Sequence, residues 1–60
     1  MQEKLLILRR RKGYSQEYIA KYLGLTTRGY SLKELGKNDF KCREMFKLSD
    51  LFEEPLERIA

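Results

Sequence analysis

The chain has 60 residues, no His, no Trp and a single Cys, so it forms one small domain (residues 1–60) that buries only about 60% of its unfolded surface. One Cys without His excludes a disulfide framework and a recognisable zinc site, and no apolar run is long enough to span a membrane; we expect a cytoplasmic protein without a cofactor. Residues 1–43 carry +7 and residues 44–60 carry −3, which suits a polyanionic partner on one side, although an unevenly charged solvated surface would look the same.

Residues 2–12 (QEKLLILRRRK) predict the first helix. Leu5 and Leu8 share one face, and basic residues crowd the last turn, where they suit the helix dipole. Leu6 and Ile7 point away from that face, so this helix carries more apolar surface than one face needs. Two interpretations are open: contact with the C-terminal helix, or a subunit interface.

Two short helices joined by a tight turn are predicted next, over residues 16–23 and 27–34. Ser15 is a good N-cap for the first, and Thr26 offers a side-chain oxygen to cap the second. Gly24 can adopt the left-handed conformation that ends a helix at little cost. Two helices joined by a short turn with Gly are typical of the helix-turn-helix, whose second helix enters the DNA major groove.

The C-terminal third predicts two more helices after a polar, basic loop at residues 37–41. The helix over residues 42–52 has a stripe at helical spacing, widened by Leu48 and formed by Cys42, Met45, Phe46, Ser49 and Phe52. Cys42 is thus predicted to be a small core residue. A final helix over residues 55–59 opens with Pro55, which the first turn tolerates. The fold class is all-α, with five short helices.

One stretch makes the pattern specific: G-x-S-Q-E-x-x-A-x-x-L-G, residues 13–24. With it, the chain from Leu5 to Ile59 resembles, without gaps, the lambdoid repressor and Cro type of helix-turn-helix domain, the XRE family. The resemblance implies a compact five-helix domain that binds operator DNA, usually as a dimer, and regulates transcription.

The resemblance also implies roles for individual residues. Gln16 matches a residue that contacts a DNA phosphate, and Arg9 and Glu34 match a structural ion pair between the first and third helices. The positions that face base edges are Thr27, Arg28 and Leu32, and those near the sugar-phosphate backbone are Lys37, Asn38 and Lys41.

Side-chain chemistry fits these roles but leaves alternatives. Arg28 can donate two hydrogen bonds to guanine, or contact a phosphate without sequence choice. Leu32 suits a thymine methyl group, although alone it would be a spare apolar residue or a dimer contact. Ser31, next to it, can serve a phosphate. Tyr30 faces the core side of the same helix, with its hydroxyl tethered.

Four positions depart from the family pattern. Lys33 replaces a large apolar residue, and we expect its stem to cover the core while its ammonium group reaches solvent. Phe40 replaces a Pro, and Glu54 replaces a Val ahead of the last helix. Gly29 costs its helix about 1 kcal/mol relative to Ala and either permits a close approach to DNA or simply lies at an unselected solvent position.

The function predicted from these residues is a sequence-specific regulator of transcription that binds a near-palindromic double-stranded operator as a homodimer. A prophage origin would suit such a small Cro-like regulator. Leu51, Leu56 and Ile59 are candidates for either the dimer surface or the monomer core. Catalysis is not expected, because Cys42 has no His partner and the carboxylates are scattered; nor is a small-molecule ligand. The alternative is a protein-interaction module on the same fold, such as an antitoxin or anti-repressor. A longer natural chain is a further possibility.

Overall fold

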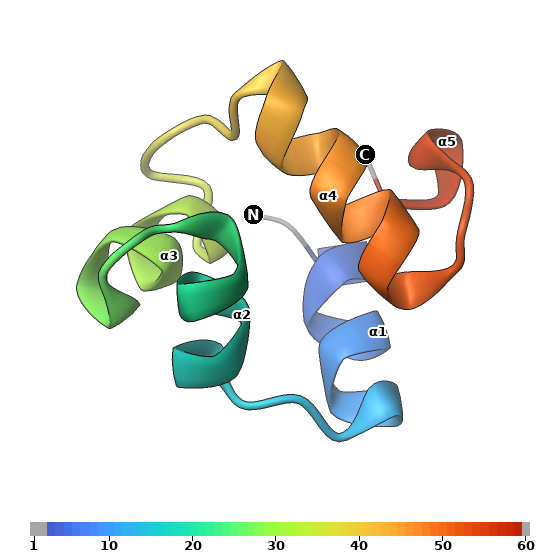
Figure 1. Ribbon diagram of the computed structural model, residues 1–60, viewed down its shortest axis with the longest axis horizontal. Coiled ribbons are helices and arrows are strands. Elements are labelled where there is room, and N and C mark those ends of the chain that lie inside the picture. Colours follow the sequence, from blue (N-terminus) through green and yellow to red (C-terminus); the bar gives the residue numbers. More distant parts are fainter. Residues whose placement is uncertain (1–2, 60) are drawn as a thin grey trace.

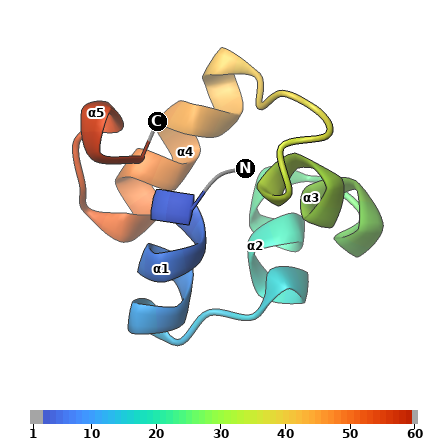
Figure 2. The same ribbon diagram turned by 180° about the vertical axis from the view of Figure 1, so that it is seen from behind.

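The computed structural model describes residues 3–59, and this range contains five helices and no strand. The helices are α1 (Glu3–Lys12), α2 (Gln16–Leu23), α3 (Thr27–Glu34), α4 (Cys42–Phe52) and α5 (Leu56–Ile59). The all-α prediction is therefore confirmed. In Figure 1, α2 and α3 lie on one side of the molecule, α5 lies at the opposite end, and α1 and α4 run between them; Figure 2 shows the same arrangement from behind.

Local chemistry sets the bounds of α2 and α3. The Ser15 hydroxyl accepts a hydrogen bond from the backbone N–H of Tyr18 at 3.0 Å, and the Thr26 hydroxyl accepts one from Gly29 at 3.0 Å. Each bond satisfies an amide that the first turn of a helix leaves free. Gly24 ends α2 at φ +75°. The predicted bounds of these two helices are confirmed.

The chain ends are less simple. Gln2, predicted to open the first helix, lies outside the described residues. The prediction that Pro55 opens the last helix is wrong, because α5 begins at Leu56. Pro55 precedes the helix, and its carbonyl accepts a hydrogen bond from the Arg58 N–H at 3.0 Å. No helix in the described range is long and apolar enough to cross a membrane.

All five helices contribute to one core. Its buried members are Leu5, Leu8, Ile19, Ala20, Leu23, Tyr30, Leu48, Phe52 and Ile59. Ile59 is only 1% exposed, so it belongs to the monomer core and not to a dimer surface. This burial also shows that α5 is docked, although Glu54 occupies the position before it.

The inward face of α4 differs from the predicted stripe. Cys42 is exposed, and Phe46 is 59% exposed, so the prediction that these two residues are buried is wrong. The buried residues are Glu44, Leu48 and Phe52. A carboxylate takes an inward position because a cationic partner neutralises it there, and this turns Cys42 and Phe46 toward solvent.

Candidate nucleic-acid interface

One face of helix α3 is buried against the rest of the domain, and the other face is exposed at the N-terminal end of the helix. Tyr30 is completely buried, and Lys33 and Glu34 are also buried. Thr27 and Arg28 are exposed at the N-terminal end, while Ser31 and Leu32 are half-buried. The buried face thus fixes the helix in place, while the Thr27 hydroxyl and the Arg28 guanidinium group remain accessible to a ligand.

The Glu34 carboxylate is the centre of the contacts that hold α3. It accepts hydrogen bonds from Arg9 Nε at 2.7 Å, Tyr30 Oη at 2.8 Å and Gln16 Nε2 at 2.9 Å. Arg9 also donates from Nη1 to the Tyr14 carbonyl at 3.0 Å. Glu34 therefore ties α1, α2 and α3 together, and Arg9 adds the turn between α1 and α2.

These contacts keep Glu34 ionised. Burial alone would raise the pKa of this carboxyl, but hydrogen bonds from Arg9, Gln16 and Tyr30 outweigh it, and the pKa is lowered from the ordinary 4.5. The pKa of Tyr30 is raised, first by burial and then by its hydrogen bond to Glu34. Tyr30 therefore remains a neutral donor to a charged acceptor at neutral pH.

Gln16 has a contact that the sequence did not reveal. Its amide nitrogen donates to Glu34, 18 residues along the chain, and the side chain is half-buried at the first position of α2. An amide nitrogen carries two hydrogens, so one remains available for a further acceptor. The bond to Glu34 therefore restricts the orientation of the amide without using its whole donor capacity.

Lys33 forms a second buried ion pair. Its ammonium nitrogen lies 2.6 Å from Glu44 Oε1, and the two side chains are only 11% and 5% exposed. The prediction that this ammonium group reaches solvent is wrong. Glu44 also accepts the Lys41 backbone N–H at 2.8 Å, so it caps α4 while it neutralises Lys33. Burial would raise the pKa of Glu44, but the bonds from Lys33 and Lys41 lower it.

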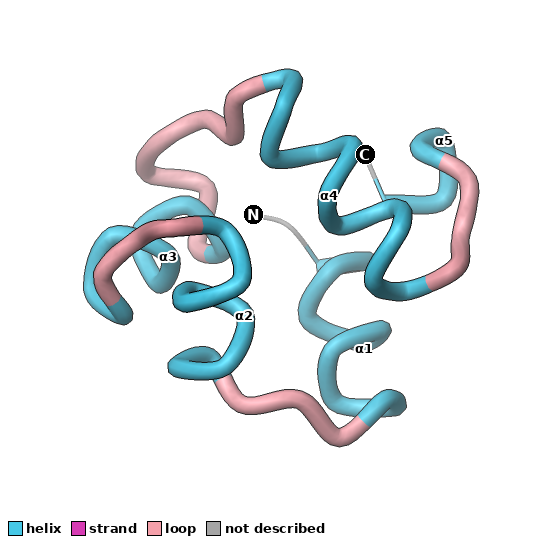
Figure 3. Tube along the Cα trace, viewed as in Figure 1, coloured by secondary structure: helices cyan, strands magenta, loops and turns pink. Residues whose placement is uncertain are grey.

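The loop between α3 and α4, the longest pink segment between helices in Figure 3, is held by Phe40. The Phe40 ring packs against Tyr30 with centroids 6.0 Å apart, and the Lys33 ammonium lies 5.9 Å from its centroid. The predicted backbone contacts, Lys37, Asn38 and Lys41, are exposed. The loop thus exposes the ammonium groups of the two lysines and the amide of Asn38, while Phe40 anchors it to α3.

Gly29 has a local explanation. A Cβ atom added there would lie 3.0 Å from the Thr26 hydroxyl oxygen, which caps the helix. This is tighter than most real contacts of a Cβ atom, so a larger residue would press on the cap. The Thr26 cap is therefore a local reason for a glycine at this position, besides a close approach to DNA or an unselected solvent position.

The pair α2 and α3, with a short turn between them and a firmly held second helix, has the arrangement of a helix-turn-helix. The chain is 41% identical over 49 residues to the SPbeta prophage-derived uncharacterized HTH-type transcriptional regulator YonR of Bacillus subtilis (strain 168). The match includes 82% of this chain but only 45% of that relative, so the chain spans less than half the length of the protein it resembles. No family model and no solved structure matches the chain.

Proposed function

We propose that this protein is a sequence-specific regulator of transcription, of the Cro and repressor type, that reads the major groove of double-stranded DNA with α3. The observation that carries the proposal is the division of α3: Tyr30, Lys33 and Glu34 are buried and bonded, while Thr27 and Arg28 are exposed at its N-terminal end. A recognition helix needs this division, because base edges are read by its first residues while its other face is fixed to the domain. Similarity to an HTH-type transcriptional regulator supports the same conclusion.

In this proposal Thr27, Arg28 and Leu32 contact bases. Arg28 is exposed and can donate two hydrogen bonds to one guanine, which is worth about 1–3 kcal/mol of discrimination. Leu32 is half-buried, so a part of its apolar surface is left for a thymine methyl group.

The phosphate contacts come from Gln16, Ser31, Lys37, Asn38 and Lys41. Gln16 would use the amide hydrogen that Glu34 leaves free, at the N-terminus of α2, where the helix dipole favours an anion. Lys37 and Lys41 would release counterions on binding, which makes the affinity depend on salt. The operator is near-palindromic in this proposal, and the protein binds it as a homodimer.

Salt dependence of binding tests the proposal. A duplex selected from a random pool by binding to the wild-type protein should bind with a log affinity that falls linearly with log salt concentration. Lys37→Ala should reduce that slope by about one and leave the sequence preference unchanged, whereas Arg28→Ala should relax the preference at one base pair. Lys47→Ala, which removes an exposed charge from α4, is the matched control.

Two results would contradict the proposal. One is equal binding of all duplexes by wild type and Arg28→Ala. The other is no binding to duplexes together with a salt-independent protein complex, which would favour the alternative, an interaction module on the same fold.

A further inference from the structure

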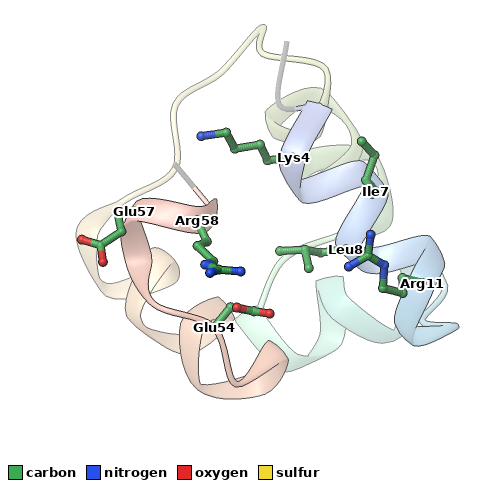
Figure 4. A pocket seen from close by; sticks show the side chains of 7 residues that line it. All are labelled: Lys4, Ile7, Leu8, Arg11, Glu54, Glu57 and Arg58. Carbon is green, nitrogen blue, oxygen red and sulfur yellow. The ribbon is translucent and has the colours of Figure 1, made fainter.

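A groove between α1 and the C-terminal end of the chain plays no part in the proposed DNA contacts. It has a volume of about 280 Å³ and is lined by Lys4, Ile7, Leu8, Arg11, Glu54, Glu57 and Arg58 (Figure 4). Ile7 is 55% exposed there, although Leu8 beside it is buried. The exposed isoleucine stands among charged side chains, so an occupant of the groove would meet an apolar centre and a polar rim, the order found in protein interfaces.

The two walls of the groove carry opposite charge. Lys4 and Arg11 come from α1, and Glu54 and Glu57 lie across from them, with Arg58 on the same side as the acidic residues (Figure 4). Neither ion pair recorded among the described side chains, those of residues 4–59, includes any of these five. Each wall therefore retains charge that an occupant of opposite sign could pair.

The charge pattern selects the occupant. A polyanion such as DNA would meet Glu54 and Glu57, and a strongly basic partner would meet Lys4 and Arg11. A second copy of the same surface has both signs and, related by a two-fold axis, can place its α1 wall against the acidic wall of the first. We propose that this groove is the interface between two copies of the chain, with Ile7 at its centre.

Long-range charge favours the same approach. Residues 1–43 carry +7, so two copies repel one another over most of their surface. Residues 44–60 carry −3, and the part of them that lines the groove, Glu54, Glu57 and Arg58, carries −1, so a basic helix of another copy is attracted to this side. The groove is lined by residues of α1 and by residues 54–58 and by none of the loop between α3 and α4. Such a dimer would serve the proposed function by leaving both α3 helices free for adjacent half-sites, and it rests on that function only for this role.

Sedimentation equilibrium of the purified chain at low salt, without DNA, tests the interface. The wild type should reach the mass of two chains. Arg11→Glu and Ile7→Ser should each weaken dimerisation about tenfold or more, because symmetry removes each contact twice. Arg10→Glu makes the same charge change on the neighbouring exposed residue outside the groove and is the control. Circular dichroism checks that each variant keeps its helices.

A charge exchange makes the test specific. A chain with Glu54→Lys and Glu57→Lys should also dimerise more weakly than the wild type, but mixing it with Arg11→Glu should restore a dimer of the two variants. A wild type that stays monomeric overturns the interface, as does a dimer that Arg11→Glu and Ile7→Ser weaken no more than Arg10→Glu does. Failure to restore the mixed dimer, with both variants folded, overturns it as well.

Binding to a single half-site separates this inference from the proposed function. At concentrations where Arg11→Glu is monomeric, it should bind one half-site as the wild type does but lose affinity for the full operator. A chain that dimerises as described and binds no DNA would refute the function and keep the interface. A chain that binds half-sites but never dimerises through the groove would do the reverse.

Discussion

Glu34→Ala should unfold the domain and not merely weaken binding. The substitution removes the acceptor of Arg9, Gln16 and Tyr30 at once and leaves a guanidinium that is only 13% exposed without its partner. Removing one member of a buried pair costs roughly 3–5 kcal/mol. A chain of 60 residues has a total stability of about 3–9 kcal/mol, so the loss is comparable with the whole.

A double-mutant cycle at Arg9 and Glu34, in urea melts followed by circular dichroism, measures how strongly the two side chains stabilise each other. The double variant, Arg9→Met with Glu34→Leu, leaves no charge without a partner. Its loss of stability should be smaller than the summed losses of the two single variants by roughly 2 kcal/mol or more. Asp50→Ala removes an exposed carboxylate and should change stability by less than about 0.5 kcal/mol. An unchanged midpoint for Glu34→Ala, or single losses that simply add, would refute the reasoning.

Three further predictions concern stability. Lys33→Met should cost on the order of 3 kcal/mol in urea melts because it strands Glu44, and adding Glu44→Gln should recover much of it; additive losses would refute the pair. The pKa values of Glu34 and Glu44 are lowered from 4.5, so on acidification the unfolded chain takes up protons before the folded one. Stability should therefore be constant above about pH 5.5 and fall below about pH 4.5, and urea midpoints unchanged down to about pH 3 would contradict this. Gly29→Ala should raise the thermal midpoint by less than the helix propensity gain of about 1 kcal/mol implies, because the new Cβ presses on the Thr26 cap; the full gain would show that the cap yields freely.

The helices could be predicted because their ends depend on neighbours in the sequence. Ser15 and Thr26 bond to amides three residues away, and Gly24 adopts the left-handed conformation, which a residue without a Cβ atom reaches at little cost. Such rules need no knowledge of the fold. The bounds of α2, α3 and α4 follow from them together with the helical spacing of apolar residues.

The orientation of α4 could not be predicted from apolar spacing alone. Its inward face includes Glu44, which a hydrophobic pattern assigns to solvent, because Lys33, eleven residues earlier, neutralises it. A local sign was available, since Glu44 is three residues after Lys41 and a Glu at this position often caps a helix. This spacing would have identified Glu44 as a cap of α4 but not Lys33 on α3 as its partner.

The candidate site shows the same limit. Family resemblance supplied Arg9 and Glu34 as a pair, and the structure places their atoms 2.7 Å apart. It did not supply the hydrogen bond from Gln16 to Glu34, because the two residues meet only once α2 packs on α3. The exposure of Thr27 and Arg28 agrees with the predicted base contacts.

Selection of bound duplexes from a random pool tests the central claim most directly, that this protein reads DNA sequence with α3. We expect enrichment of a near-palindromic motif with half-sites about one helical turn apart, roughly 34 Å, and a changed preference at one position for Arg28→Ala. A pool that shows no enrichment, with wild type and Arg28→Ala behaving alike, would contradict it.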